Sequence, residues 1–172
     1  CVVVDPGPDD PAHAERIAAI VGGIELVLVT HRHGDHTDGI DHLRAFTDAP
    51  VRAVTERFCR DGAPLVPGGD DDEVIHAAGL DIVVLPTPGH TADSVSLEIR
   101  PAGAGFTAPP DCVVLGDTIL GRDSTVLDST DGDLGDYLGS MDLLAARADG
   151  VVGIPGHGPD VENTGRAASD SG

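Results

Sequence analysis

The feature that most constrains this 172-residue chain is the segment from residue 31 to 36, which places three imidazoles and one carboxylate directly behind an apolar run. Imidazole and carboxylate groups are ligands that borderline divalent metals prefer. If the chain stays extended past the strand, alternate side chains share a face, so His31, His33 and Asp35 point one way. His36 then points another way. Two ligand sets facing different directions predict two metal ions, and a chance polar loop is disfavoured.

More ligands are needed, because a catalytic metal keeps one position for water and takes its other ligands from several parts of the chain. Three later segments share one pattern, in which an apolar strand runs into a glycine-containing turn that ends in a ligand-type residue: His90, Asp117 and His157. Each glycine lets the backbone turn sharply and approach a metal closely. Any one such segment is commonly only a capped turn, but three of them after the first motif predict further ligands.

These residues, in this order, resemble the metallo-beta-lactamase superfamily, whose signature is His-x-His-x-Asp-His followed by a His, an Asp and a His on successive strand ends. The Asp-Pro-Gly at 5–7 and the Pro-Gly-His-Gly-Pro at 155–159 agree with it as well. The resemblance implies two divalent metal ions with one aspartate bridging them. The implied ligands are His31, His33 and His90 for the first metal, Asp35, His36 and His157 for the second, and Asp117 for both.

By the same resemblance, the chain is a metal-dependent hydrolase that attacks its substrate with a metal-bound hydroxide. Asp35 would be the catalytic residue, because it would bind a metal, orient the hydroxide and return a proton to the leaving group. Zinc is the expected metal for so many histidines, although manganese and iron accept the same ligand types. The best-known antibiotic-hydrolysing subclass carries Cys in place of Asp117, and flavodiiron relatives carry Glu in place of His33, so neither activity is expected.

The resemblance also implies the fold, an α/β protein arranged as an αββα sandwich. Residues 116–121 and 136–140 are similar to the lactamase-beta-2-like subfamily, some of whose members cleave single-stranded RNA. Those relatives usually carry extra strands ahead of the position of Cys1 and a helical domain after the last histidine, so we expect a fragment trimmed at both ends. We expect one metallo-beta-lactamase-like domain over residues 1–160 and a disordered or frayed tail over 161–172.

The charge of the chain bears on its substrate. Thirty acidic residues against ten arginines give a formal net charge of -20, and there is no lysine. Such a surface repels polyanions, and two bound divalent cations would offset only about four charge units. We therefore expect a small-molecule substrate, namely a small ester, thioester or lactone of the kind used by glyoxalase-II-like members, and nucleic acid is a disfavoured partner.

Three alternatives stay open. The subfamily motifs favour a phosphodiesterase or endoribonuclease acting on single-stranded RNA, in conflict with the charge. Mono-iron sulfur dioxygenase chemistry resembles only the first-metal half, and it ranks lower because the second ligand set is complete. The last alternative is a non-catalytic metal-binding fragment, because both ends of the domain look short. The sequence does not indicate an oligomeric state.

Periodicity and turn signals predict the elements around these motifs. The predicted helices cover 10–20, 37–46 and 134–147, the predicted strands cover 2–5, 24–30, 51–54, 81–85, 94–99, 112–115 and 151–154, and 55–79 is loop-rich. No apolar run reaches the length of a membrane span. Three widely spaced cysteines do not make a disulfide framework, so we expect a reducing, cytoplasmic location. His13, His42 and His76 lack the strand-end context, and we expect them to be solvated.

Overall fold

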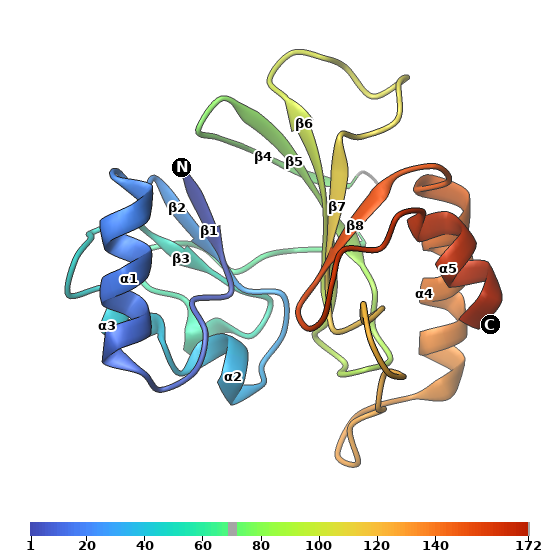
Figure 1. Cartoon of the computed structure of the whole chain (residues 1–172), viewed down its shortest axis with the longest axis horizontal. Helices are drawn as coiled ribbons and strands as arrows, with labels where there is room; N and C mark the ends of the chain where they lie inside the picture. The colour runs from blue at the N-terminus through green and yellow to red at the C-terminus, as the bar shows by residue number, and fades with distance from the viewer. Residues whose placement is uncertain (69–71, 172) are drawn as a thin grey trace. The chain divides into compact units, whose positions relative to one another are not determined.

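In the computed structural model, the described residues, 1–68 and 72–171, belong to two compact units, Cys1–Val66 and Pro67–Gly172 (Figure 1). Each unit contains its own sheet, its own helices and a hydrophobic core cluster. The single domain that we expected over residues 1–160 stays a prediction. Among the described helices, none is both long and apolar enough to cross a membrane.

The first unit is built on a parallel sheet of β1 (Val2–Val4), β2 (Leu26–Leu28) and β3 (Val51–Arg52), in that order. Parallel neighbours need a crossover connection, and α1 (Pro11–Val21) supplies it between β1 and β2. Helix α1 begins as predicted, because the side chain of Asp10 accepts a hydrogen bond at 2.9 Å from the amide two residues on. The core of this unit consists of Val3, Ala14, Val27, Val29, Ile40, Leu43, Val51 and Ala53.

The connection from β2 to β3 differs from the single helix predicted over 37–46. It contains two short helices, α2 (Gly34–Thr37) and α3 (Ile40–Leu43), which are separated at Gly39. The Gly39 amide donates to the Gly7 carbonyl at 2.8 Å, and a Cβ on Gly39 would lie 2.5 Å from another carbonyl oxygen of the same turn. The segment therefore bends at a glycine that packs directly against the Asp-Pro-Gly turn.

The second unit contains a five-stranded sheet in the order β4-β5-β6-β7-β8. Neighbouring strands are antiparallel except β7 and β8, which are parallel and are connected through α4. The strands are β4 (Glu73–Ala77), β5 (Leu80–Pro86), β6 (Val95–Pro101), β7 (Cys112–Gly116) and β8 (Val152–Pro155), and the helices are α4 (Leu134–Arg147) and α5 (Thr164–Ser171). Both helices lie on the same side of this sheet (Figure 1). The core cluster that they share with it contains Val83, Leu85, Val113, Leu115, Ile119, Met141, Leu144, Ala148, Val151 and Ala168.

Strand β4 lies in the stretch 55–79 that we predicted as loop-rich; residues 69–71 of that stretch lie outside the described residues. It pairs with β5 through a two-residue turn, in which φ is 51° at Ala78 and 75° at Gly79. Positive φ at both central positions is the geometry of tight hairpin turns, for which Asn-Gly and Asp-Gly are the usual sequences. Ala-Gly lacks that signal, so the sequence gives little indication of the hairpin. A short 3-10 helix, η1 (Glu56–Phe58), also lies in this stretch.

Helix α5 replaces the disordered or frayed tail that we expected over 161–172, and that expectation is corrected for the helical residues. The Gly165 amide donates to the Ala148 carbonyl at 3.0 Å, and Ala168 is fully buried in the core cluster. A Cβ on Gly165 would lie 2.7 Å from the Asp149 backbone, so only glycine allows this close approach. The small residues that suggested disorder are the ones that let α5 pack.

We expect Ala168→Asp to destabilise the chain strongly, because it would place an unpaired carboxylate in the core beneath α5. The free energy of unfolding should fall by about 3 kcal/mol or more, which lowers the melting temperature by on the order of 10 °C. Ser169→Asp, at an exposed position of the same helix, is the matched control and should change the melting temperature by no more than about 2 °C. Equal melting temperatures for the two variants by circular dichroism would contradict the packed helix.

Candidate metal centre

The histidine-rich motif lies in the first unit, between β2 and α2. The backbone is extended at His33, but Gly34 starts α2, so Asp35 and His36 lie on a helical turn and not on a continued strand. The expected alternation of faces therefore ends at His33. The helix still returns His36 to the cluster, since its ring centroid lies 4.2 Å from that of His31. The His31 and His33 centroids lie 4.8 Å apart.

Asp5, directly after β1, holds this motif in place. Its Oδ1 accepts from the Thr30 amide at 2.8 Å, and its Oδ2 accepts from the Thr30 hydroxyl at 2.7 Å and from His36 Nδ1 at 2.8 Å. Asp5 has a φ of 52°, a left-handed conformation that is uncommon outside glycine. One carboxylate therefore joins the end of β1, the end of β2 and helix α2.

These hydrogen bonds determine which ring nitrogen carries the proton. A carboxylate only accepts, so a neutral His36 donates from Nδ1 and carries its lone pair on Nε2. The Thr30 hydroxyl already donates to Asp5, so it accepts from His31 Nδ1 at 3.0 Å. The lone pair of His31 is then on Nε2, which lies 3.1 Å from His33 Nδ1. Two nitrogens bound to one tetrahedral zinc lie about 3.3 Å apart, so this pair has the spacing of two ligands of one metal.

In the second unit, His90 follows β5 in a turn that the segment before α4 supports. His90 Nδ1 donates to the Val126 carbonyl, which places the lone pair of the neutral ring on Nε2. The Asp133 amide donates to the Gly89 carbonyl at 3.0 Å and so ties the same turn to the start of α4. Glycine is needed here, because φ is 130° and a Cβ would lie 2.4 Å from the Tyr137 Cα.

Asp117 directly follows β7, near the other two predicted ligands of the second unit. Its Oδ2 lies 3.7 Å from His90 Nε2 and 3.5 Å from His157 Nε2. Because β7 and β8 are parallel, Asp117 and His157 both lie beyond the carboxyl ends of neighbouring strands. One carboxylate oxygen near ligand spacing from two nitrogens suits a carboxylate that bridges two cations. The donors of this cluster therefore fit divalent metal ions, as those of the first unit do.

The structure groups the seven predicted ligands into one cluster in each unit: His31, His33, Asp35 and His36 in the first, and His90, Asp117 and His157 in the second. That the two clusters bind the same pair of metals stays a prediction. Sequence reasoning missed the groups that orient the ligands, namely Asp5, Thr30 and the Val126 carbonyl. Of these, Asp5 had a visible signal, because its Asp-Pro-Gly segment directly follows a strand.

The three remaining histidines are absent from these clusters. His42 Nε2 contacts Asp9 Oδ1 at 2.6 Å, and His76 Nδ1 contacts Asp81 Oδ1 at 2.7 Å. Together with a hydrogen bond from the Gly103 amide, which has the larger effect, His76 holds the pKa of Asp81 below its usual value. The His76 side chain is 74% exposed, which makes it a suitable control histidine.

Comparison with known proteins finds relatives along most of the chain. A family model described as "Beta-lactamase superfamily domain" matches residues 1–131. The chain is 32% identical to the Beta-lactamase-like protein 2 homolog of Caenorhabditis elegans over 94% of its length and 53% of that protein's. It is 36% identical to a hydroxyacylglutathione hydrolase of Pseudomonas putida over 70% of its length and 43% of that protein's. It is 29% identical to an atrochrysone carboxyl ACP thioesterase of Aspergillus chevalieri over 91% of its length and 47% of that protein's. The chain spans about half the length of the curated relatives it matches.

Solved structures share the fold. The BLEG-1 B3 metallo-beta-lactamase aligns with a TM-score of 0.77 at 21% identity, over 98% of this chain and 85% of that one. ETHE1 from Myxococcus xanthus aligns with a TM-score of 0.74 at 26% identity, over 99% of this chain and 72% of that one. The predicted α/β fold with two sheets is therefore confirmed.

We expect Asp5→Asn to weaken zinc binding by about 10- to 100-fold, because the carboxylate that orients His36 and Thr30 would be lost. Competition with a chromophoric chelator measures this affinity, and a thermal melt without metal checks that the fold is retained. Asp9→Asn is the matched control, since Asp9 also contacts a histidine but one outside the ligand set. An unchanged affinity in folded Asp5→Asn would overturn the orienting role.

Proposed function

Because this chain belongs to the metallo-beta-lactamase superfamily, we propose that it is a metal-dependent hydrolase of small esters, thioesters or lactones. Two relatives support the hydrolytic reaction by their names, a hydroxyacylglutathione hydrolase and an ACP thioesterase. The observation that carries the proposal is the orientation of the rings. His31, His36 and His90 each make a hydrogen bond through Nδ1, which leaves Nε2 as the atom that binds a metal.

In this proposal the two clusters together bind two divalent cations, and Asp117 is shared between them. The spacing of Asp117 Oδ2 from two histidine nitrogens supports the shared role, and the 3.1 Å between His31 and His33 nitrogens supports a common ion for that pair. We expect zinc because most of these ligands are histidines, and manganese and iron would use the same donors.

The bound ions would supply a water molecule of lowered pKa as the nucleophile at neutral pH. Asp35 is the residue to which we assign the proton transfer. Its Oδ2 lies 3.7 Å from His36 Nε2 and its side chain is 52% exposed, so the carboxylate reaches both the ligand cluster and solvent. It would accept the proton of the attacking water and deliver it to the leaving group.

The charge of the chain supports a small substrate over RNA. A formal charge of -20 with only ten basic residues opposes the binding of a polyanion, and two divalent cations offset little of it. The motifs at 116–121 and 136–140 favour the endoribonuclease alternative, which we therefore keep as the second candidate. A small acyl substrate places far less negative charge against this surface.

We expect about two equivalents of zinc per chain by elemental analysis, and a lower melting temperature after chelation. Asp117→Ala should remove more than half of the zinc, because one carboxylate would serve both ions. His157→Ala should lower the content toward one equivalent, whereas His76→Ala should leave it at two. Zinc, manganese and iron contents all near zero in the unaltered chain would contradict the proposal and favour a fragment without catalysis.

We expect the zinc-loaded chain to hydrolyse a short-chain acyl thioester with a rate that changes little across a salt series. Measured at a zinc concentration that keeps both metals bound, Asp35→Ala should lower that turnover about 100-fold. Single-stranded RNA should be cleaved slowly or not at all under the same conditions. Faster cleavage of RNA than of the thioester, with rates that fall as salt rises, would favour the endoribonuclease instead.

A further inference from the structure

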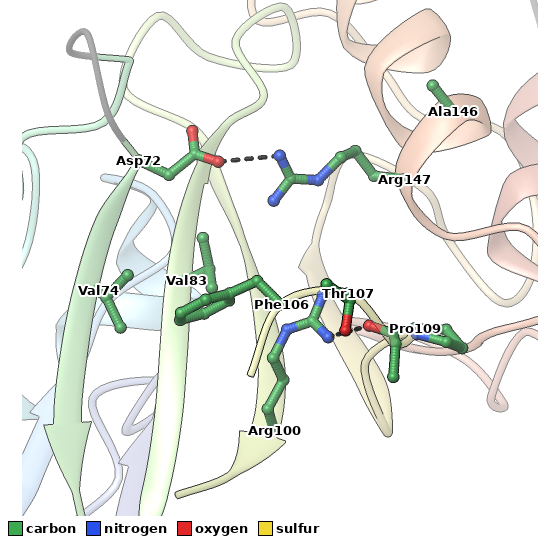
Figure 2. Close-up of a pocket in the computed structure, with 10 residues that line it drawn as sticks. Asp72, Val74, Val83, Arg100, Phe106, Thr107, Pro109, Ala146 and Arg147 are labelled. Atoms are coloured by element: carbon green, nitrogen blue, oxygen red, sulfur yellow. Dashed lines mark hydrogen bonds and ion pairs between the residues drawn. The ribbon is translucent and has the colours of Figure 1, made fainter. Parts of the chain in front are cut away.

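The second unit contains a cavity of about 570 Å³ that the proposed hydrolase does not use. Its walls come from β4, β5, the end of β6, the segment between β6 and β7, and the end of α4 (Figure 2). His90 precedes the start of β6, whereas Arg100 lies near the other end of this strand. A strand of this length spans roughly 20 Å, so the Arg100 end of the cavity lies far along the sheet from His90. None of the residues that line the cavity is a predicted metal ligand.

A buried ion-pair network forms one wall. Glu98 is fully buried and accepts from Arg147 Nε at 2.9 Å, from Arg147 Nη2 at 3.2 Å and from Arg100 Nη2 at 3.0 Å. Arg147 Nη1 also donates to Asp72 at 2.9 Å, as Figure 2 shows. The network contains two cations and two carboxylates, so the wall is neutral overall although it is strongly polar.

Part of the hydrogen-bonding capacity of this wall is left over. A guanidinium has five N–H groups, and the hydrogen bonds from Arg147 to Glu98 and Asp72 use three of them. As far as the described residues go, the other two N–H groups of Arg147 remain for a ligand. Arg100 Nε is a buried donor for which no described residue is an acceptor. Buried donors without partners are rare, and a bound water or ion is one common explanation for them.

An aromatic surface lies beside these donors. Phe106 is 57% exposed although it lines the cavity, and the Arg100 guanidinium lies 5.6 Å from its ring centroid. Val83 lines the same cavity and is drawn with Phe106 in Figure 2. The rest of the apolar lining comes from Val74, Ala108, Pro109 and Ala146. A flat ring is the ligand surface that such an aromatic wall recognises best.

We propose that this cavity binds an uncharged planar ligand of the aromatic carboxamide class. Its carbonyl would accept from the remaining N–H groups of Arg147, its amide N–H would donate to Asp72, and its ring would lie against Phe106. We expect the ligand to be uncharged because of the charges in this wall. An anionic ligand would face two carboxylates and the net charge of -20, and a cationic ligand would face two arginines. The site is independent of the metal centre.

Three probes of nearly the same shape separate the chemistries: benzamide, benzoate and benzamidine. Benzamide offers both an acceptor and a donor, benzoate is an anion with acceptors only, and benzamidine is a cation with donors only. Titration of the metal-free 172-residue chain, followed by the arginine Nε–H signals in nitrogen-15 correlation spectra, reports binding at the wall itself. We expect benzamide to shift the Arg147 and Arg100 Nε–H signals, with a Kd at least about fivefold lower than for the charged probes.

Two variants test the contacts. Phe106→Ala should raise the benzamide Kd about tenfold through loss of ring contact, and Asp72→Asn should raise it about fivefold through loss of the charged acceptor. Phe46→Ala is the matched control, because Phe46 is 53% exposed and lies in the first unit. Its benzamide Kd should be unchanged.

Tighter binding of benzoate or benzamidine would overturn the assigned ligand class, and absence of binding by all three probes would overturn the site. An equal loss of affinity in Phe46→Ala and Phe106→Ala would also overturn it. Because these measurements need neither metal nor turnover, their outcome is separate from that of the proposed hydrolase.

Discussion

The carboxylate of Asp5 is the interaction on which the histidine cluster of the first unit depends. It accepts from the amide and hydroxyl of Thr30 and from the ring of His36, so three segments share one acceptor group. The left-handed backbone at Asp5 is unfavourable by itself, and such strain persists where surrounding contacts determine it. Ligand rings that are oriented before a cation binds lose less freedom when it arrives.

The second unit depends on charge inside its core. In the register of the sheet, Glu98 lies between Val83 and Val113, where two arginines neutralise it. The Glu98 hydrogen bond holds the pKa of Arg147 above its ordinary value, so this residue stays a cation. Removing one partner of such a pair leaves a buried charge, which destabilises a protein strongly. The last turn of α4 is therefore fixed to the sheet, while its first turn is fixed to the His90 turn.

Much of the site could be predicted from the sequence, because its residues are ligand types at strand ends. Helices α1 and α4 were also predictable from local sequence, because each begins at an aspartate N-cap. The bend at Gly39 and helix α5 could not be predicted, because each depends on contacts with distant segments. The β4–β5 turn was missed because Ala-Gly lacks the usual signal of a tight turn. The buried polar face of strand β6 is the clearest feature that the sequence does not reveal.

In β6, alternate residues are polar, which usually indicates a face in water. Ser96, Glu98 and Arg100 are instead buried. Arg147 neutralises part of the charge of Glu98 on this face, and it comes from a helix far along the chain. Alternation alone does not reveal such a partner.

The parallel pairing of β7 and β8 has a consequence for how such proteins diversify. Asp117 and His157 are anchored by neighbouring strands, while the chain between them runs through a long crossover. Insertions and exchanges in that crossover can accumulate without displacing either anchor, provided that the backbone groups at Val126 and Asp133 still support the His90 turn. Recombination of this one segment between homologous genes is thus a route to sequence change that leaves Asp117 and His157 in place.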